Sequence, residues 1–142
     1  MAPCALAEVQ VMFFDTDCGG VVSNIAYLRF IEMARTNLVE QLGLALVEMA
    51  RKQTYPVVVR TEIDYRRAGR LGDRLVVEGW LDRVERARFW CAFRITRPQD
   101  GVLIAECRQM LALVEMPGGK LLRLPEHWKT YGKANSNRVI PG

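Results

Sequence analysis

Histidine is almost absent from this chain, which has 142 residues and a single histidine, His127. Catalytic Ser–His and Cys–His pairs need a positioned imidazole, and zinc sites need a cluster of Cys and His ligands. His127 stands alone near a polar C-terminus, so the sequence argues against both kinds of site. We therefore expect no metal and no cofactor, and any catalytic groups to be carboxylates and backbone dipoles.

Paired cysteines and long apolar runs are also lacking. None of the four cysteines stands in a CxxC pair, and no apolar run is long enough to cross a bilayer. The first residues have neither the basic region nor the apolar core of a signal peptide. These absences predict a cytoplasmic protein with free thiols. Cys91 and Cys107 lie in strand-like runs, which predicts that both are core residues.

A concentrated basic stripe is missing as well. The net charge is +4, carried mostly by arginine, but acids alternate with the basic residues between positions 82 and 88. This pattern does not predict a nucleic-acid partner, although an excess of cations suits an anionic ligand. The length and the 50% share of hydrophobic residues predict one domain over residues 1–142.

The apolar spacing predicts one long helix followed by strands. We predict a strand over 8–14, a helix from Ser23 or Asn24 to about Leu42, and a short helix over 44–51. Four further strands follow, over 56–67, 74–84, 88–97 and 102–115, and a frayed polar tail begins at about Trp128. Strands joined by consecutive hairpins predict an antiparallel sheet with the helix on one face, an α+β fold.

One face of the long helix is apolar at spacings of three and four residues. Its members are Tyr27, Ile31, Ala34, Leu38 and Leu42, with Phe30 and Met33 widening the stripe. The sequence therefore predicts that this face is buried against a broad apolar surface.

The segment DTDCGGVVSN, from Asp15 to Asn24, carries the chemistry. It places two carboxylates and two glycines at the start of the long helix, where backbone N–H groups have no partner inside the helix and the helix dipole favours negative charge. A carboxylate beside oriented N–H groups is a minimal arrangement for acyl transfer. The alternative is that the acids only cap the helix and the glycines only form the turn.

The order of elements resembles the hotdog fold, in which a five-stranded antiparallel sheet wraps around a long central helix. The motif DTDxGGVV, Tyr27 and the segment from Glu32 to Arg35 resemble the acyl-CoA thioesterases of the 4-hydroxybenzoyl-CoA thioesterase group, which includes Tol–Pal-associated thioesterases. Further similarity lies in IDYRR (63–67), RLGD (70–73) and KLLRLP (120–125). The resemblance covers about residues 8–127.

The resemblance implies a thioester hydrolase in which Asp17 is the catalytic nucleophile or general base. A backbone N–H near Asn24 would polarise the thioester carbonyl, and Asp15 would orient the loop. The implied substrate-binding residues are Gly20, Val21, Tyr27 and Tyr65, with Arg86 and Arg88 as candidates for the coenzyme A phosphates. The resemblance also implies a homodimer or homotetramer with active sites between subunits, the helix of one facing the sheet of its partner.

The motif departs from Tol–Pal-associated members at Ser23-Asn24, where they often carry a histidine. Short-chain acyl specificity is therefore not carried over. Two alternatives to an acyl-CoA thioesterase stay open: a hotdog hydratase or dehydratase acting on acyl thioesters, and a non-catalytic module that binds them. The acyl group is also open, as is the choice between coenzyme A and an acyl-carrier protein.

Overall fold

The central element of the computed structural model, which describes residues 2–135, is the long helix α1 (Asn24–Gln41). Ser23 caps it, because the Ser23 Oγ accepts a hydrogen bond from the Ala26 N–H at 3.2 Å. The helix therefore begins and ends close to the positions predicted from the sequence.

The buried face of α1 follows the predicted stripe with one exception. Tyr27, Ile31, Ala34 and Leu38 are buried, but Met33 is 43% exposed. Its assignment to the buried stripe is wrong, because the sheet covers only one side of the helix and Met33 lies on the flank.

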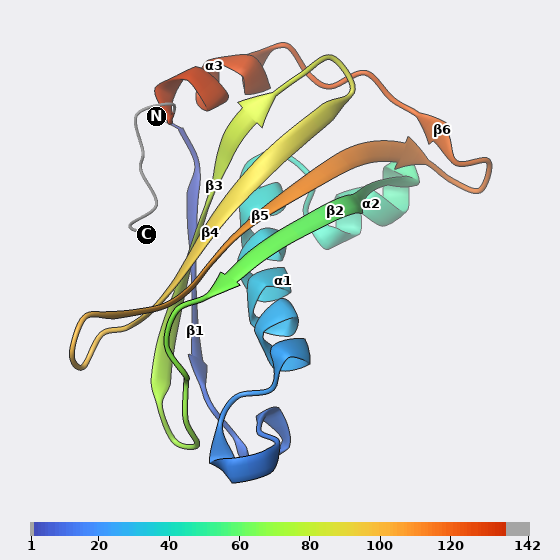
Figure 1. The fold of residues 1–142 in the computed structure, drawn as a ribbon. Helices are drawn as coiled ribbons and strands as arrows, with labels where there is room; N and C mark the ends of the chain where they lie inside the picture. The colour runs from blue at the N-terminus through green and yellow to red at the C-terminus, as the bar shows by residue number, and fades with distance from the viewer. Residues whose placement is uncertain (1, 136–142) are drawn as a thin grey trace.

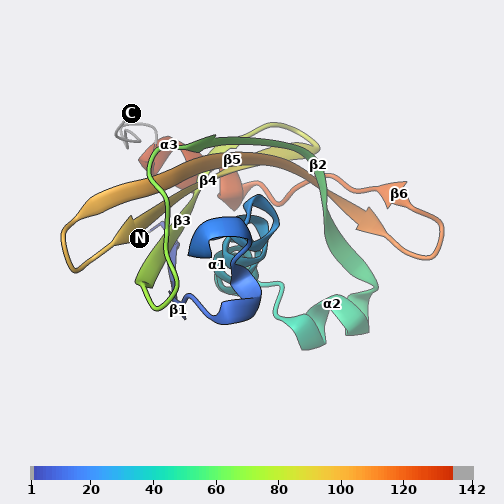
Figure 2. The same cartoon turned by 60° about the horizontal axis from the view of Figure 1, so that its bottom comes forward.

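A single curved antiparallel sheet wraps around α1 (Figures 1 and 2). Its strands in the described residues are β1 (Cys4–Gln10), β2 (Thr54–Tyr65), β3 (Arg74–Val84), β4 (Arg88–Arg97), β5 (Val102–Glu115) and the short β6 (Lys120–Leu121). The spatial order is β1-β3-β4-β5-β2, and β6 pairs with β5. The predicted antiparallel sheet with a helix on one face is confirmed.

The prediction of consecutive hairpins is wrong at one place. β2 pairs with β5 instead of β3, so residues 66–73 cross from one edge of the sheet toward the other (Figure 1). This crossing passes the start of α1, where the Val22 N–H donates to the Gly69 C=O at 2.8 Å. The long-range pairing of β2 therefore brings the β2–β3 connection to the motif that begins at Asp15.

The alternation predicted for β2 is also interrupted. A β-bulge between Val58 and Arg60 shifts the register by one residue. Val58, opposite Leu111, thus faces the same side of the sheet as Thr61, which is opposite Gln109.

Both ends of the chain differ from the prediction. β1 starts at Cys4 and ends at Gln10, and a 3₁₀ turn, η1 (Phe13–Asp15), replaces the expected end of the first strand. The predicted frayed tail contains a helix, α3 (His127–Ala134), because Trp128 is buried and packs edge-on against Phe89 with ring centroids 5.2 Å apart.

The predicted short helix is confirmed as α2 (Leu46–Lys52), which lies on the connection between α1 and β2 (Figure 2). In the described part of the chain, no helix combines the length and the apolar character that a membrane crossing requires.

Candidate active site

Asp15 joins the loop before α1 to the helix itself. Its side chain is 2% exposed, and its Oδ2 accepts a hydrogen bond from the Met12 N–H at 2.9 Å. Its Oδ1 forms an ion pair with Arg29 of α1, while its backbone C=O accepts the Ser23 N–H at 2.9 Å. Asp15 therefore fixes the loop at both ends, which agrees with the orienting role that the resemblance implied.

Asp17 stands at the start of a tight turn, η2 (Cys18–Gly20). Its N–H donates to the Val21 C=O at 3.0 Å, and its C=O accepts the Gly20 N–H at 3.2 Å. Gly19 and Gly20 have φ of +82° and +73°, a region in which glycine is favoured because it has no Cβ. The Asp17 side chain is exposed and has no hydrogen-bond or ion-pair partner among residues 2–135. The turn thus presents an unpaired carboxylate.

The first backbone N–H of α1 is free to bind a ligand. Ser23 accepts hydrogen bonds from the N–H groups of Ala26 and Tyr27, whereas the Asn24 N–H has no acceptor within the described residues. The helix dipole adds partial positive charge at this end. An oxygen that gains negative charge during a reaction would therefore be stabilised beside Asn24.

A pocket of about 320 Å³ opens beside the start of α1. It is lined by Val21, Val22, Asn24, Tyr27, Tyr65, Arg66, Arg67 and Ala68. The fold thus brings four of the predicted site residues to one pocket from two distant segments. Asp17 and Gly20 do not line it, but the hydrogen bond between the Asp17 N–H and the Val21 C=O holds the Asp17 backbone against a residue of the pocket wall.

Two tyrosines form the aromatic part of this pocket. The rings of Tyr27 and Tyr65 lie 5.4 Å apart at an interplanar angle of 48°. The Tyr27 hydroxyl accepts a hydrogen bond from the Gly69 N–H at 2.9 Å. Burial raises the pKa of both tyrosines above the usual value, so both phenols stay protonated at neutral pH.

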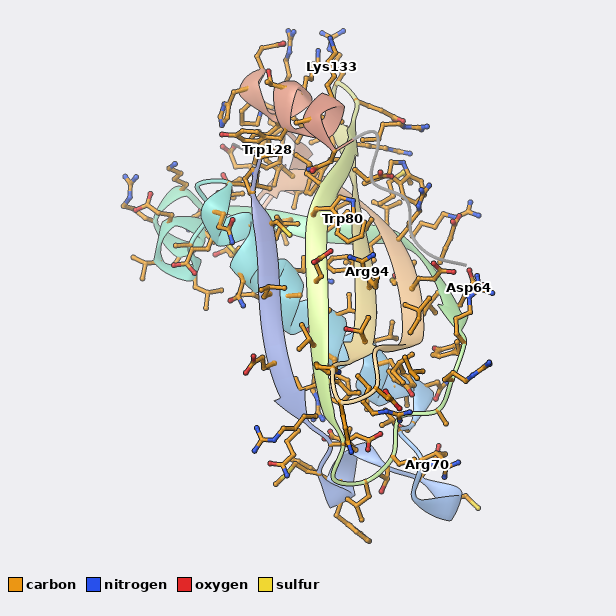
Figure 3. All side chains as sticks on the ribbon, turned by 90° about the vertical axis from the view of Figure 1, so that its left-hand side faces the viewer. Asp64, Arg70, Trp80, Arg94, Trp128 and Lys133 are labelled. Carbon is orange, nitrogen blue, oxygen red and sulfur yellow. The ribbon has the colours of Figure 1, made fainter. Side chains whose placement is uncertain are left out.

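Arg86 and Arg88 lie at the opposite end of the sheet. The Arg86 C=O accepts the Leu124 N–H at 3.0 Å, and Arg88 starts β4 opposite Ala112 of β5. Figure 3 shows the two ends of the molecule, with Arg70 near η2 at one and α3 at the other. One chain alone therefore does not bring Arg86 and Arg88 to the pocket, and their role as phosphate ligands stays a prediction.

Sequence reasoning missed the cations that do adjoin the pocket. Arg66 donates from Nε to Glu106 at 2.9 Å, so its charge is largely neutralised. Arg67 donates only to the backbone C=O of Arg66, at 3.0 Å, and has no carboxylate partner among residues 2–135. Arg70 forms an antiparallel β-bridge with Val21, and its side chain likewise has no ion pair among residues 2–135. The signal in the sequence that could have indicated these cations was the adjacent pair Arg66-Arg67, directly after the residues of β2.

Of the four cysteines, Cys18 is exposed, Cys4 is half-buried, and Cys91 and Cys107 are buried in the core. Cys18 is exposed beside Asp17, whereas burial raises the thiol pKa values of Cys91 and Cys107 to about 12. The predicted core positions of Cys91 and Cys107 are confirmed, and neither thiol is a nucleophile at neutral pH.

Residues 4–130 match the family model described as the thioesterase-like superfamily. The chain is 32% identical over 122 residues to the acyl-CoA thioesterase YbgC of Haemophilus influenzae, covering 85% of this chain and 88% of that protein. It is 27% identical over 124 residues to the 1,4-dihydroxy-2-naphthoyl-CoA hydrolase of Synechocystis, covering 87% and 90%. A solved 1,4-dihydroxy-2-naphthoyl-CoA thioesterase from Synechocystis has a TM-score of 0.78 and 25% identity, covering 92% and 96%.

Proposed function

The chain belongs to the thioesterase-like superfamily, and from this premise we propose that it hydrolyses acyl-CoA thioesters with the Asp17 carboxylate. Asp17 acts as nucleophile or as general base, and the Asn24 N–H polarises the thioester carbonyl. The observation that carries the proposal is the unpaired Asp17 carboxylate on a turn whose backbone is hydrogen-bonded to Val21, a residue that lines the same pocket as Asn24. The predicted hotdog fold is confirmed by the wrapped sheet and the thioesterase neighbours.

The reaction needs no histidine. The carboxylate, or a water that it deprotonates, adds to the carbonyl carbon, and the carbonyl electron pair moves onto oxygen beside the helix start. The intermediate then collapses, the C–S bond breaks and the thiolate leaves. Attack by water gives the free acid directly, whereas attack by the carboxylate gives an anhydride on Asp17, which a water then hydrolyses to release the acid and restore the carboxylate. A thiol has a pKa of about 8.5, so it departs as thiolate without strong help from a general acid. The main requirement is therefore to stabilise the negative charge that develops on the carbonyl oxygen, and an oriented N–H group does this.

The substrate phosphates need cations at the mouth of the pocket. Arg67 and Arg70 are exposed and lie on the β2–β3 connection. Their guanidinium groups have no carboxylate partner in the described residues, although the Arg70 backbone N–H donates to the Asp73 carboxylate at 3.0 Å. A phosphate binds such an arginine without first displacing an acid. We therefore assign phosphate binding within one chain to Arg67 and Arg70.

The open edge of the sheet supports a dimer. At the β1 edge, the side chains of Asn37 and Gln41 donate to the carbonyl oxygens of Leu6 and Cys4, at 3.1 and 3.3 Å. At the other edge, β2 pairs only with β5 in the described residues and exposes the run Val57–Val59. An open apolar edge strand favours pairing with another chain.

Exposed apolar residues beside the loop that precedes α1 also favour binding of a second copy of the chain. Phe13 is 82% exposed, and Phe14 and Ile25 are also largely exposed close to Asp15 and the start of α1. A second copy that covers this apolar surface would complete the site between subunits. The oligomer and a cytoplasmic location stay predictions from the sequence.

The test of the mechanism is Asp17→Asn, which keeps the shape but removes the negative charge. We expect kcat on the preferred acyl-CoA to fall at least about a hundredfold, the effect of losing a general base or nucleophile. The matched control is Asp64→Asn, because Asp64 is an exposed carboxylate on β2 outside the pocket. The substrate is found with a panel of short, long and aromatic acyl-CoAs.

Two outcomes would contradict the proposal. If Asp17→Asn matches the parent across the panel, Asp17 is not the catalytic group. If the parent binds acyl-CoA tightly but hydrolyses none of the panel, the chain is a binding module.

A further inference from the structure

The Tyr27 ring is held rigidly at the start of α1. The side chain is 4% exposed, and the ring packs edge-on against Phe30 with centroids 6.2 Å apart, in addition to its contact with Tyr65. Side chains on a helix point back toward its N-terminus. Tyr27 therefore directs its hydroxyl toward the same end of α1 that exposes the Asn24 N–H.

The hydroxyl uses only half of its hydrogen-bonding capacity. It accepts the Gly69 N–H at 2.9 Å, but a phenol also has one O–H to donate. No acceptor for that O–H lies among residues 2–135. Buried polar groups are almost always satisfied, so an unused donor at a pocket wall indicates a ligand or water that accepts from it.

The pocket reaches the region around this hydroxyl. Its lining includes Tyr27 and Asn24, and also Val22 and Ala68. Ala68 precedes Gly69, whose N–H bonds the Tyr27 oxygen, and Val22 is hydrogen-bonded to the Gly69 C=O. Tyr27 and Asn24 therefore line one cavity, and the Tyr27 oxygen lies beside Gly69, which directly follows the lining residue Ala68.

Gly69 permits the close approach of the hydroxyl to the backbone. A Cβ at position 69 would lie 3.0 Å from the Val22 Cγ2 and 3.3 Å from the Tyr27 hydroxyl oxygen. Both distances are tighter than ordinary van der Waals contact. Glycine at this position thus keeps the accepting hydrogen bond in place and leaves the O–H to face the cavity.

We propose that the Tyr27 hydroxyl donates a hydrogen bond to the thioester carbonyl oxygen and acts with the Asn24 N–H as a second oxyanion donor. This rests on the proposed thioester hydrolysis, and it makes Tyr27 a catalytic residue in addition to a pocket wall. The hydrogen bond strengthens as the oxygen gains charge, and no proton leaves Tyr27. Burial keeps the phenol in its protonated form, as a donor requires.

The first test is Tyr27→Phe, which removes a single oxygen atom. We expect kcat to fall about tenfold to a hundredfold, which lies at and below the lower end of the range of about 100-fold to 1,000-fold for losing one oxyanion donor. KM, and the Kd of an unreactive thioether analogue of the substrate, stay within about twofold. The control is Tyr131→Phe on α3, at the far end of the molecule, which should keep the parental kcat.

The second test covers the case in which Tyr27→Phe fails to fold, since it leaves the Gly69 N–H without an acceptor. Incorporating 3,5-difluorotyrosine at position 27 keeps the hydroxyl but lowers its pKa. We expect the rate of this variant to fall at a lower alkaline pH than that of the parent, because ionisation removes the donor. A residue that only shapes the pocket would leave the pH profile unchanged.

The outcomes separate this inference from the proposed function. If Tyr27→Phe keeps the parental kcat, or the difluorotyrosine variant keeps the parental pH profile, Tyr27 is not an oxyanion donor, although hydrolysis through Asp17 still stands. If Asp17→Asn is fully active, the proposed mechanism fails independently of Tyr27.

Discussion

At the scale of single residues, burial separates two acids that are two positions apart. Asp15 is buried and paired with Arg29, whereas Asp17 is exposed and unpaired within the described residues. The charge of a buried, paired carboxylate is neutralised by its partner within the folded structure. An exposed, unpaired carboxylate remains available to a substrate or a water. The different roles proposed for Asp15 and Asp17 follow from this difference.

The arginines at the pocket allow a residue-scale prediction. Arg67→Gln should raise KM for an acyl-CoA about threefold to tenfold and leave kcat unchanged, because a phosphate contact binds the ground and transition states equally. The effect should shrink as salt increases. The measurement is steady-state kinetics with an acyl-CoA and with a truncated thioester that lacks the nucleotide phosphates.

The controls for this prediction lie elsewhere in the chain. Arg123→Gln, on an exposed arginine paired with Glu126, should leave KM unchanged. Arg86→Gln and Arg88→Gln test the assignment made from the sequence. If these two raise KM and Arg67→Gln does not, the phosphates bind at the far end of the sheet, on a neighbouring subunit.

At the scale of elements, the start of α1 and the loop before it form one unit. Ser23 caps the helix, its N–H donates to the Asp15 C=O, and Arg29 reaches back from the second turn to the Asp15 carboxylate. The Arg29 guanidinium also lies over the Phe14 ring, 5.4 Å from its centroid. The loop therefore cannot move without disturbing the helix, which keeps Asp17 in position relative to the Asn24 N–H.

Breaking the Arg29–Asp15 pair is the element-scale prediction. Arg29→Met leaves a buried carboxylate without its cation and should cost about 1–2 kcal/mol of unfolding free energy, allowing for the solvent that reaches Arg29. We expect kcat to fall about tenfold, since the displaced loop misplaces Asp17. The measurements are urea unfolding and steady-state kinetics.

A double variant sharpens this prediction. Adding Asp15→Asn to Arg29→Met removes the unpaired charge, so part of the lost stability should return. Arg51→Met on α2, which breaks an exposed pair with Glu48, should leave the unfolding free energy nearly unchanged, because water screens this pair. Equal losses from Arg29→Met and Arg51→Met would show that the buried pair has no special role.

At the scale of the whole molecule, the sheet has one occupied edge and one open edge. Side chains of α1 bind carbonyl oxygens of β1, while β2 presents exposed valines and no second strand in the described residues. The pocket and the exposed Phe13–Phe14 surface lie near the end of α1 that β2 and its connection approach. In this proposal, two chains that pair through β2 therefore also complete the active site.

The molecular prediction concerns assembly. We expect the parent to have at least twice the mass of one chain by light scattering at micromolar concentration. Val59→Lys should shift it toward the monomer and lower the activity in parallel, because a charge on an edge strand opposes pairing. Leu6→Lys on the occupied β1 edge is the control and should change neither property. A fully active monomeric parent would contradict the proposal.

The sequence alone determined most of the elements and predicted the chemical class of the site. The capping Ser23, the helical stripe and the strand periodicities are local, so α1, α2 and four of the strands could be predicted within a few residues. The scarcity of histidine and the DTDxGGVV motif narrowed the chemistry to a carboxylate and backbone N–H groups. These features depend only on residues that are near one another in the chain.

The tertiary structure alone decided which distant segments meet. β2 pairs with β5, a partner about fifty positions away, and this choice carries Tyr65, Arg67 and Gly69 to the start of α1. The tertiary structure also separates Arg86 and Arg88 from the pocket, and the packing of Trp128 against Phe89 forms α3 in the predicted polar tail. Periodicity shows which face of a strand is apolar but not which strand lies beside it. The partner of the Tyr27 hydroxyl, and thus its unused O–H, could be found only once the chain was folded.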